Sequence, residues 1–556
     1  MRNYIVFTLI AFVLSLFHTA SAQYWMRQGG GLTIDESADI AVDNSGNSYT
    51  VGYFTGSATF GTTTLTSSGS TDIFLVKTND QGVVQWAVSA GGTGSDKGLS
   101  VAVDDSGNPY ITGFYNGTAS FSTTSLTSAG LQDVFVAKYT TAGVLSWAIS
   151  AGGVNADIGN GIAVDGSGNA AIAGEFKGSA TFGTSTLSSQ SGSTDVFVMH
   201  VSSTGTVNWV QQGAGANTDR GIDVAFDLGG NVYATGAFSQ SITFDVLHTN
   251  TMFNVIFLIK LNNLGVEQWF KIIGGGSSNI VNALTSDSSG NIYATGDFTG
   301  TMTFFNNPNT TLSATNTNRV FVVKYTPAGA TSWSAANSSE NDLTSQAIAV
   351  DGNENVYITG HFKCTHTEFT TQYGDAIFNS IGDNDVYVSK FDNTGTWDYA
   401  KHFGGRGEDF SYGIDAKINN QAHICGSYDQ AMYFPVSANF ISTNISNFTA
   451  SNCTGNDGYC GDADYGKFRG TTTSGNADAF FANPVDPNRE PYDFYERSGT
   501  SCVKEILPPC INTGCPDTVS NCQSVFLQAF LDECDDIRPS YNYQWNGIGV
   551  SPNNTT

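Results

Sequence analysis

Three observations predict the fold class: a residue pattern that recurs seven times, four strand-like segments in each repeat, and an N-terminal segment that matches a strand missing from the last repeat. Together they predict an all-β fold, a seven-bladed β-propeller of four-stranded blades. The N-terminal strand is expected to close the last blade, and a small Cys-rich segment follows the propeller. The expected boundaries are a signal peptide at 1–22, the propeller at 23–483, a linker at 484–500, the Cys-rich segment at 501–535, and a truncated further domain or disordered tail at 536–556.

The repeat is about sixty residues long and is visible as columns of similar residues. A glycine ends the second strand of each repeat, at Gly52, Gly113, Gly174, Gly236, Gly296, Gly360 and Gly426. An aromatic residue follows two positions later, at Phe54, Tyr115, Phe176, Phe238, Phe298, Phe362 and Tyr428. Columns seven deep do not arise by chance, so the sequence predicts a repeat architecture.

The first repeat shows how each unit is expected to fold. Its strands are predicted at 38–42, 48–54, 73–78 and 83–88, joined in pairs by the turns Asp43–Asn47 and Asn79–Gly82. Gly and Asn in these turns supply the positive φ that tight hairpins need. One four-stranded sheet cannot bury both faces, whereas a ring of sheets packs each face on a neighbour. This explains why the strands are almost continuously apolar.

A tryptophan column indicates how the ring closes. Tryptophans mark the predicted fourth strand at Trp86, Trp147, Trp209, Trp269, Trp333 and Trp397. The last repeat has a third strand at Asp478–Ala482 but no tryptophan after it, and the segment Gln23–Gly30 matches Gln85–Gly92. The N-terminal strand is therefore expected to complete the last sheet and leave no open edge. The alternative is an open array with a half-unit at each end, which the cost of unprotected half-units disfavours.

The segment Ile40–Tyr53 is a short apolar strand followed by Asp-x-Ser-Gly-Asn-x-Tyr-x-x-Gly-Tyr, and it returns at Val101–Tyr115 and Ile348–Phe362. This signature resembles the bacterial seven-bladed β-propeller repeat family. The resemblance covers residues 23–483 and departs most at Lys417–Gln421 in the last repeat. It implies a secreted or cell-surface propeller, often part of a longer multidomain chain, and it carries no agreed catalytic residues.

The first 22 residues predict export. Arg2 precedes the apolar run Ile5–Phe17, which is too short to span a bilayer, and a small-residue cleavage site ends at Ala22. We expect a secreted or cell-surface protein after cleavage near Ala22. The net charge of −27 repels phosphate backbones and anionic lipids, which argues against nucleic acid as a partner. No other apolar run is long enough for membrane insertion.

An acidic column at the links between repeats is the main candidate site: Asp35, Asp96, Asp157, Asp219, Asp342 and Asp409, with Asn279 in the remaining repeat. Each precedes an innermost strand, so the column is expected to ring one mouth of the central channel. Clustered carboxylates suit Ca²⁺ or a basic ligand, and no other cofactor is predicted. In the alternative, each Asp accepts backbone N–H bonds and fixes its Gly-rich link. Turn preferences favour this local role.

Two further patterns have a metal-binding and a structural interpretation. The Asp-x-Ser-Gly-Asn turns lack the ligand spacing and terminal Glu of a calcium loop, so turn chemistry explains them better. Residues His361, Cys364 and His366 cluster, with His423 and Cys425 one repeat on, a spacing suited to zinc. The structural alternative places the two strand histidines in aromatic core columns. It leaves Cys364 and Cys425 paired with each other or buried as thiols, and no metal site is predicted.

All nine cysteines follow residue 363, and disulfides are expected in an exported chain. The loop between the second and third strands of the last repeat spans 429–477 and holds Cys453 and Cys460, which we expect to form a local disulfide. Five more cysteines lie within 502–534, and the odd total leaves one without an intramolecular partner. The corresponding loops of other repeats, such as Thr55–Thr71, are expected to contain a small hairpin.

No Ser–His–Asp order, catalytic carboxylate pair or phosphate-cradling loop is evident, so no catalytic residue is predicted. The leading hypothesis is a non-enzymatic scaffold that recognises an extracellular glycan or protein through its loop-rich face, because loops on a rigid frame usually carry recognition. The first alternative is an extracellular polysaccharide lyase or hydrolase with carboxylates at the channel mouth, which predicts loss of turnover when Asp96 and Asp157 become Asn. The second alternative is a structural spacer in a larger adhesin.

Overall fold

The computed structural model describes residues 25–31, 33–252, 254–275, 278–304, 310–314, 318–337, 343–363, 367–371, 374–378, 380, 383–405, 407–417, 421–428, 432–433 and 478–483. The chain divides into two compact units, and all described residues belong to the first, which comprises Met1–Thr449 and Gly466–Pro491. The predicted signal peptide, linker, Cys-rich segment and tail lie outside the described residues, as does the predicted disulfide Cys453–Cys460.

The described residues form antiparallel sheets, and the one helical element among them is the short 3-10 turn η1 (Gln190–Gly192). The innermost strands of the repeats are β2 (Asp35–Val42), β8 (Lys97–Val103), β12 (Ile158–Val164), β18 (Arg220–Phe226), β24 (Ser278–Ser286), β30 (Leu343–Val350) and β36 (Asp409–Asp415). The second strands are β3 (Ser48–Phe54), β9 (Pro109–Phe121), β13 (Ala170–Lys177), β19 (Val232–Phe238), β25 (Ile292–Thr299), β31 (Val356–Phe362) and β37 (His423–Tyr428).

Two more strands complete each repeat. The third strands are β6 (Asp72–Thr78), β10 (Thr124–Tyr139), β16 (Thr194–Val201), β22 (Val255–Leu261), β28 (Arg319–Tyr325), β34 (Asp385–Phe391) and β39 (Asp478–Asn483). The outer strands are β7 (Val84–Gly92), β11 (Leu145–Gly153), β17 (Val207–Gly213), β23 (Glu267–Gly274), β29 (Thr331–Ala336), β35 (Trp397–Gly405) and β1 (Trp25–Gly31). Each strand pairs antiparallel with the next in its repeat, as predicted, and further pairings join several repeats into larger sheets.

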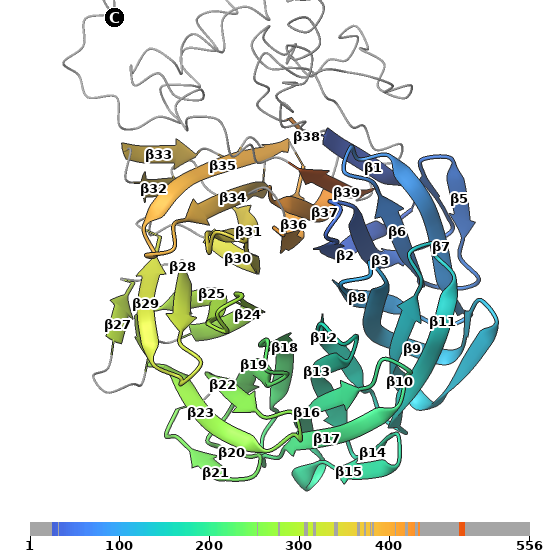
Figure 1. Ribbon diagram of the computed structural model, residues 1–556, viewed down its shortest axis with the longest axis horizontal. Helices are drawn as coiled ribbons and strands as arrows, with labels where there is room; N and C mark the ends of the chain where they lie inside the picture. The colour runs from blue at the N-terminus through green and yellow to red at the C-terminus, as the bar shows by residue number, and fades with distance from the viewer. Residues whose placement is uncertain are drawn as a thin grey trace, which may run out of the picture. The chain divides into compact units, whose positions relative to one another are not determined.

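The last sheet is built from both ends of the described chain. Strand β1 pairs with β39 in the register Trp25↔Asn483 and Gln28↔Phe480, and β39 pairs with β37. The innermost strands contact one another in sequence from β2 to β36, and β36 in turn contacts β2 (Figure 1). The Ser37 hydroxyl donates a hydrogen bond to the Gly426 carbonyl across this junction (2.7 Å). The predicted pairing of the N-terminal strand is confirmed, and the open array is excluded.

Small hairpins follow most second strands, as expected, and they also clasp the preceding repeat. They comprise β4 (Ser57–Phe60) with β5 (Thr63–Thr66), β14 (Ser179–Phe182) with β15 (Ser185–Ser188), β20 (Ser241–Thr243) with β21 (Leu247–Thr249), β26 (Thr301–Phe304) with β27 (Thr310–Ser313), and β32 (Thr367–Thr371) with β33 (Gly374–Phe378). In the last repeat, the described residues at this place form the single strand β38 (Met432–Tyr433). Several of these pair with the outer strand of the repeat before, as in Gly29↔Phe60 and Gly152↔Thr181. Neighbouring sheets are thus joined by backbone hydrogen bonds as well as by packing.

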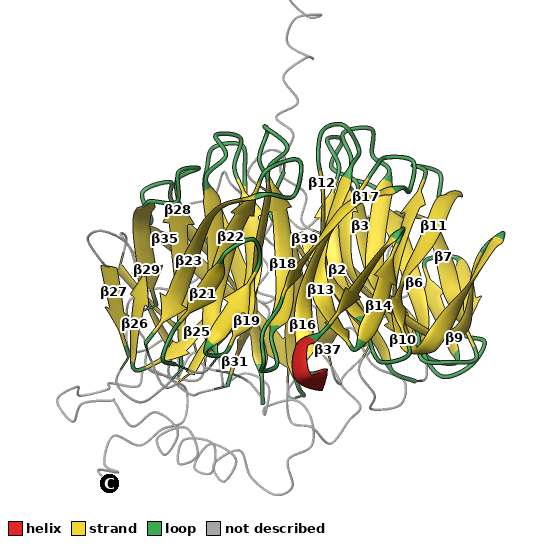
Figure 2. Ribbon diagram, turned by 90° about the horizontal axis from the view of Figure 1, so that it is seen from below, coloured by secondary structure: helices red, strands yellow, loops and turns green. Residues whose placement is uncertain are grey.

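The two ends of the strands differ in character. We call one end the turn face, because it carries the tight hairpins such as Asp43–Asn47 and Asn79–Gly82. The other end, the loop-rich face, carries the links from outer to innermost strands, the clasping hairpins and η1 (Figure 2). Every innermost strand has a β-bulge near this face, between Ser37 and Asp39 in β2 and at the equivalent positions elsewhere. A bulge twists its strand and redirects a side chain, in this case next to the axis of the ring.

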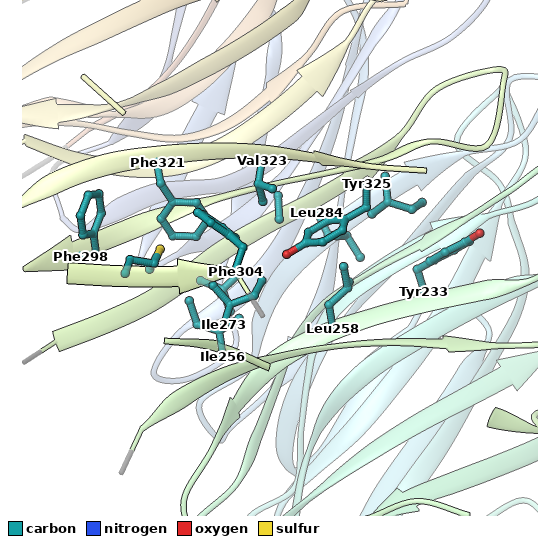
Figure 3. Packing of buried hydrophobic residues seen from close by; sticks show 14 of the residues in the cluster. Tyr233, Ile256, Leu258, Ile273, Leu284, Phe298, Phe304, Phe321, Val323 and Tyr325 are labelled. Carbon is teal, nitrogen blue, oxygen red and sulfur yellow. The ribbon is translucent and has the colours of Figure 1, made fainter. Parts of the chain in front are cut away.

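The hydrophobic core lies between adjacent sheets. One cluster joins Tyr233 and Leu258 of the β18 repeat to Leu284, Phe298 and Phe321 of the β24 repeat, all buried (Figure 3). Such packing removes large aromatic and aliphatic areas from water, and each Å² of buried apolar surface contributes roughly 25 cal/mol to stability. Because each sheet contributes both faces to such clusters, the continuous apolar strands follow directly from the architecture.

The tryptophans lock each outer strand onto the next repeat. Trp86 Nε1 donates a hydrogen bond to the Thr141 carbonyl (3.0 Å), and its ring packs on Gly143. Equivalent bonds join Trp147 to Ser203, Trp209 to Asn263, Trp269 to Pro327 and Trp333 to Asn393. Trp397 lies on the predicted fourth strand, β35, but out of register with the other tryptophans. Lys390 pairs with Tyr399, as Lys77 pairs with Trp86, so Tyr399 holds the column and Trp397 lies two residues earlier.

Candidate functional site

The predicted acidic column is built into the links. Asp35, Asp96, Asp157, Asp219 and Asp409 have no exposed surface, and Asn279 is 6% exposed. The carboxylates of four members accept a backbone N–H bond from the glycine four residues earlier, as from Gly92 to Asp96 and Gly153 to Asp157 (both 2.7 Å). Asp219 instead accepts the Ser239 N–H at 3.1 Å. The second oxygen of Asp157 accepts the Lys177 N–H at 3.0 Å, which ties the link to the next second strand. This bonding favours the local role, and Asp342 lies outside the described residues.

A second carboxylate accompanies several members of this column. The position that a Cβ would take on Gly152 lies 2.9 Å from both Asp133 Oδ1 and Asp157 Oδ2, so the two acids flank a place that only glycine fits. Burial, reinforced by the charge of Asp133, raises the pKa of Asp157 to about 6. Burial and the charge of Asp195 raise the pKa of Asp219 to about 7. The links therefore hold protons at mildly acidic pH, when ordinary aspartates do not.

The Asp-x-Ser-Gly-Asn turns close on themselves. Asp43 Oδ1 accepts the backbone N–H groups of Ser45 (2.8 Å) and Asn47 (3.0 Å), and Asp43 Oδ2 accepts the Asn47 amide (2.7 Å) and the Tyr49 hydroxyl (3.2 Å). The same pattern recurs at Asp104, Asp165, Asp227, Asp287 and Asp351. The carboxylate oxygens are occupied by the turn itself, which confirms the turn-chemistry interpretation.

The histidine and cysteine cluster lies partly within the described residues. His423 occupies the column of Tyr49 and is 3% exposed, as expected of a core substitution. Cys425 is a buried free thiol, so of the two alternatives for this residue the structure shows the unpaired one. Cys364 and His366 lie outside the described residues. Among the described residues, no group of three or more His, Cys, Asp or Glu side chains is arranged to hold a metal ion.

Three aspartates near the axis escaped the sequence analysis. Asp39 Oδ2 accepts the Val101 N–H (2.9 Å), Asp223 accepts the Leu284 N–H (2.7 Å), and Asp415 accepts the Val42 N–H (2.7 Å). Each bond joins one innermost strand to the next. Burial raises the pKa of Asp39 to about 6 and that of Asp223 to about 7, and the charge of Asp39 contributes to the latter. Asp39 and Asp223 are marked by replacement of the small residues at equivalent positions, such as Ser100, Gly161 and Ala283. Asp415 lies two residues further along its strand and replaces an alanine, the residue at the equivalent Ala41 and Ala102.

One column changes from repeat to repeat. It lies one residue after the position of Asp35, which Asn279 holds in the fifth repeat and Leu343 in the sixth, and it consists of Glu36, Lys97, Ile158, Arg220, Ile280, Thr344 and Phe410. All of these residues are at least partly exposed, and each lies at the loop-rich end of an innermost strand. The framework columns keep one residue type because the backbone geometry demands it, whereas this column keeps its backbone register and varies its chemistry. We call these seven residues the mouth column; sequence reasoning missed them because it searched for repeated residues.

Contacts divide the mouth into two sectors. In the first, Glu36 Oε2 accepts the Tyr53 hydroxyl (2.5 Å) and also interacts with the Tyr412 hydroxyl, while Lys97 Nζ lies 3.6 Å from the centre of the Tyr53 ring. The ring of Phe410 lies 6.1 Å from that of Tyr412. These residues come from β2, β3, β8 and β36.

The same sector continues to β31, and the second sector lies across the ring. The His361 imidazole meets the edge of Phe410 at 4.8 Å and contacts the Thr344 hydroxyl at 3.0 Å. Burial lowers the pKa of His361 to about 4, which keeps it neutral near pH 7. In the second sector Arg220, 60% exposed, forms an ion pair with Glu175 at 3.1 Å, and Ile280 is 48% exposed.

The repeated sheets, clasping hairpins and aspartate turns are those of a β-propeller scaffold. A family model described as "Beta-propeller repeat" matches residues 268–297. Within the described part of the chain, none of the helical segments reaches the length and hydropathy that a bilayer-spanning helix requires.

The comparisons also include a curated protein and a solved structure. An uncharacterized WD repeat-containing protein of Acanthamoeba polyphaga mimivirus is 24% identical over 506 residues, which is 74% of this chain and 36% of the relative. The chain thus spans about a third of that relative's length. A protein of unknown function from Bacteroides caccae, whose crystal structure is solved, matches 59% of this chain and 89% of its own at 10% identity and a TM-score of 0.31, which adds nothing to the argument.

Proposed function

We propose that the protein is an exported, seven-bladed β-propeller that acts as a non-enzymatic recognition scaffold in the secreted or cell-surface compartment. The repeat columns, the cyclic contacts of the innermost strands and the pairing of β1 with β39 support the ring. The basic residue, apolar run and small-residue site before Gln23 support export. The chain is proposed to belong to a longer surface protein, as its Cys-rich C-terminal segment suggests.

The working surface in this proposal is the mouth column on the loop-rich face, and its ligand is an extracellular glycan or protein. The observation that carries the proposal is the variation of this column on an otherwise repeated frame. Identical backbone positions that carry Glu36, Lys97 and Phe410 have no common structural task. A rigid scaffold with a varied surface column is the usual arrangement for recognition.

The register of the closing pair supports the choice of face. Trp25 pairs with Asn483, so the chain enters β1 and leaves β39 at the same end of the ring. Strand β1 runs from there toward the link that ends at Asp35, which places both chain connections on the turn face.

No observation favours the enzyme alternative over this one. A lyase or hydrolase that uses Asp96 and Asp157 would need those carboxylates in contact with substrate. Both have no exposed surface, and both oxygens of each accept backbone N–H bonds, Asp96 from Gly92 and Asn116. The spacer alternative gives no reason for the mouth column to vary.

The test is a binding screen of the secreted full-length protein against an array of glycans and a panel of extracellular proteins. We expect at least one ligand whose binding is weakened by Arg220→Ala or Lys97→Ala in the mouth column. Leu228→Ala is the matched control, because Leu228 is 84% exposed in a turn on the opposite face. Equal binding by all variants would contradict the choice of face, and an array without any ligand would favour the spacer.

A further inference from the structure

The first sector of the mouth combines ring faces with paired donors and acceptors. Phe410 and Tyr412 lie on one strand with their ring centroids 6.1 Å apart and their ring planes 20° apart, so the two rings are nearly parallel, and both residues are partly exposed. His361 packs against Phe410 in a T-shaped arrangement with an interplanar angle of 85°, which holds the Phe410 ring in place. Partly exposed aromatic rings held in place present a flat apolar surface at low entropic cost.

Polar groups border this aromatic surface. Glu36 accepts hydrogen bonds from the hydroxyls of Tyr53 and Tyr412. A carboxylate has about four acceptor positions, so Glu36 keeps capacity for further donors. The Lys97 ammonium, held over the Tyr53 ring, offers three donors next to it. Acceptors and donors thus alternate along the edge of an apolar plane.

We infer that this sector, formed by Glu36, Tyr53, Lys97, Phe410 and Tyr412, binds a neutral saccharide. A pyranose ring has an apolar C–H face that stacks on an aromatic plane and a rim of hydroxyls that both donate and accept. The sector supplies the complement of each part. The inference deepens the proposed function and rests on it, since it names the ligand class for the same face.

Other ligand classes fit less well. An anionic polymer is repelled by the Glu36 carboxylate and by the net charge of −27 on the protein. A basic peptide meets the positive charges of Lys97 in this sector and of Arg220 across the mouth. Among the described residues, no group of three or more His, Cys, Asp or Glu side chains is arranged to hold a calcium ion that could bridge to a sugar. A ligand that is neutral, flat on one face and hydroxylated at its rim remains.

The experiment uses the secreted full-length protein and four neutral hexasaccharide probes, built from glucose, mannose, galactose and xylose, in isothermal titration and saturation-transfer NMR. Alginate and oligolysine serve as anionic and cationic counter-probes. We expect at least one neutral probe to bind, with its C–H face receiving the saturation. Phe410→Ala is expected to weaken that binding about tenfold, the scale of one lost aromatic contact.

Two variants guard against loss of folding. Tyr53→Phe and Tyr412→Phe keep the rings and remove only the hydroxyls that orient Glu36. They are expected to weaken binding several-fold while the protein stays folded, because one lost hydrogen bond is a small part of its stability. Leu264→Ala, on the turn face and 73% exposed, is the control that keeps full affinity. Equal saccharide affinity in Phe410→Ala and in both Tyr→Phe variants overturns the inference.

The outcomes separate this inference from the proposed function. Binding of oligolysine or of a protein from the panel, weakened by Arg220→Ala, with no binding of any neutral probe, overturns the saccharide inference and leaves the recognition scaffold standing. Failure of every probe and every panel member overturns both. Saccharide binding that is lost in Phe410→Ala and kept in Leu264→Ala supports both.

Discussion

The carboxylate of Asp415, on the last innermost strand, accepts a hydrogen bond from the backbone N–H of Val42, on the first, at 2.7 Å. The two residues are 373 positions apart in sequence, and the bond lies where the ring closes. The other oxygen of Asp415 accepts the Ala416 N–H at 2.7 Å, so both oxygens are committed to backbone donors. A side chain with two acceptors is required at this position.

Replacement of Asp415 by Asn is therefore expected to destabilise the ring. An amide presents an N–H₂ group to one of the two backbone donors, and a buried donor without an acceptor costs about 1–3 kcal/mol. The measurement is the free energy of unfolding in urea. Asp105→Asn, at an exposed position, is the control and is expected to have no effect. Similar stabilities for the two variants would show that Asp415 is not needed for closure.

The packing of Trp86 on Gly143 gives a second prediction. Gly143 has φ of +77°, and a Cβ there would lie 2.8 Å from Trp86 Cδ2. Gly117 has φ of +73°, with nothing within 4 Å of its Cβ position. Gly117→Ala is expected to cost only the left-handed backbone conformation, about 1–2 kcal/mol, whereas Gly143→Ala also displaces the indole ring. A double-mutant cycle with Trp86→Phe measures the coupling, and additive effects would refute the contact.

The pH dependence of stability follows from buried acids and histidines. Burial raises the pKa of Asp39, Asp72 and Asp157 to about 6 and that of Asp219, Asp223 and Asp297 to about 7. Unfolded aspartates titrate near 3.8, so between about pH 4 and pH 7 the folded state binds protons that the unfolded state does not. The free energy of unfolding contributed by these acids falls as the pH rises through this window.

Three histidines with a strongly lowered pKa act in the opposite direction, and His200, whose pKa burial also lowers, acts with them. Burial lowers the pKa of His361, His402 and His423 to about 4, so their contribution to stability rises with pH between about 4 and 6.5. Six raised acids outweigh the lowered histidines, and the melting temperature is expected to be higher at pH 5 than at pH 8. Asp219→Asn is expected to flatten this dependence, because the amide has no proton to lose. A melting temperature that rises from pH 5 to pH 8 would contradict the assignment.

The aspartate turns predict independence from calcium. Asp43→Ala removes the acceptor for two backbone N–H groups and for the Tyr49 hydroxyl, with an expected loss of about 1–3 kcal/mol, whereas Asn44→Ala at the exposed neighbouring position is expected to be neutral. Addition of EDTA is expected to leave the melting temperature of the wild-type protein unchanged. A calcium-dependent increase that disappears in Asp43→Ala would show that the turn is a cation loop instead.

The sequence specifies the framework well because each framework column answers a local requirement. The Asp43 turn, the glycine at position 52 and the strand alternation around it are readable from turn chemistry and hydrophobic patterning alone. The closing strand at Trp25 was also predictable, because the last repeat lacked a fourth strand of its own. Side-chain identity was a weaker guide to register. Trp397 imitates the tryptophan column from two residues away, and only the strand pairing identifies Tyr399 as the true member.

The candidate site was less predictable, because burial decides which polar residues face a ligand. Asp96 and Asp157 belong to a column that recurs in most repeats, and in the structure their carboxylates are buried and accept backbone N–H bonds. Such burial depends on three-dimensional packing, which the sequence pattern does not show. Glu36 and Phe410 do not repeat, and their proximity through Tyr412 depends on closure between the first and last sheets. A search for positions whose residue type changes from one repeat to the next would have found the mouth column from the sequence, but not its division into sectors.

The register of the closing pair has a mechanical consequence. Because Trp25 lies opposite Asn483, the chain continues in both directions from the same end of the β1–β39 pair. A shearing force would load all of the hydrogen bonds between β1 and β39 at once. A force that pulls these two points apart instead breaks the bonds one after another, starting at the Trp25–Asn483 end. Under such a force the first part of the molecule to yield is the seam between β1 and β39, while the sheets away from it, which carry most of the packing, stay folded.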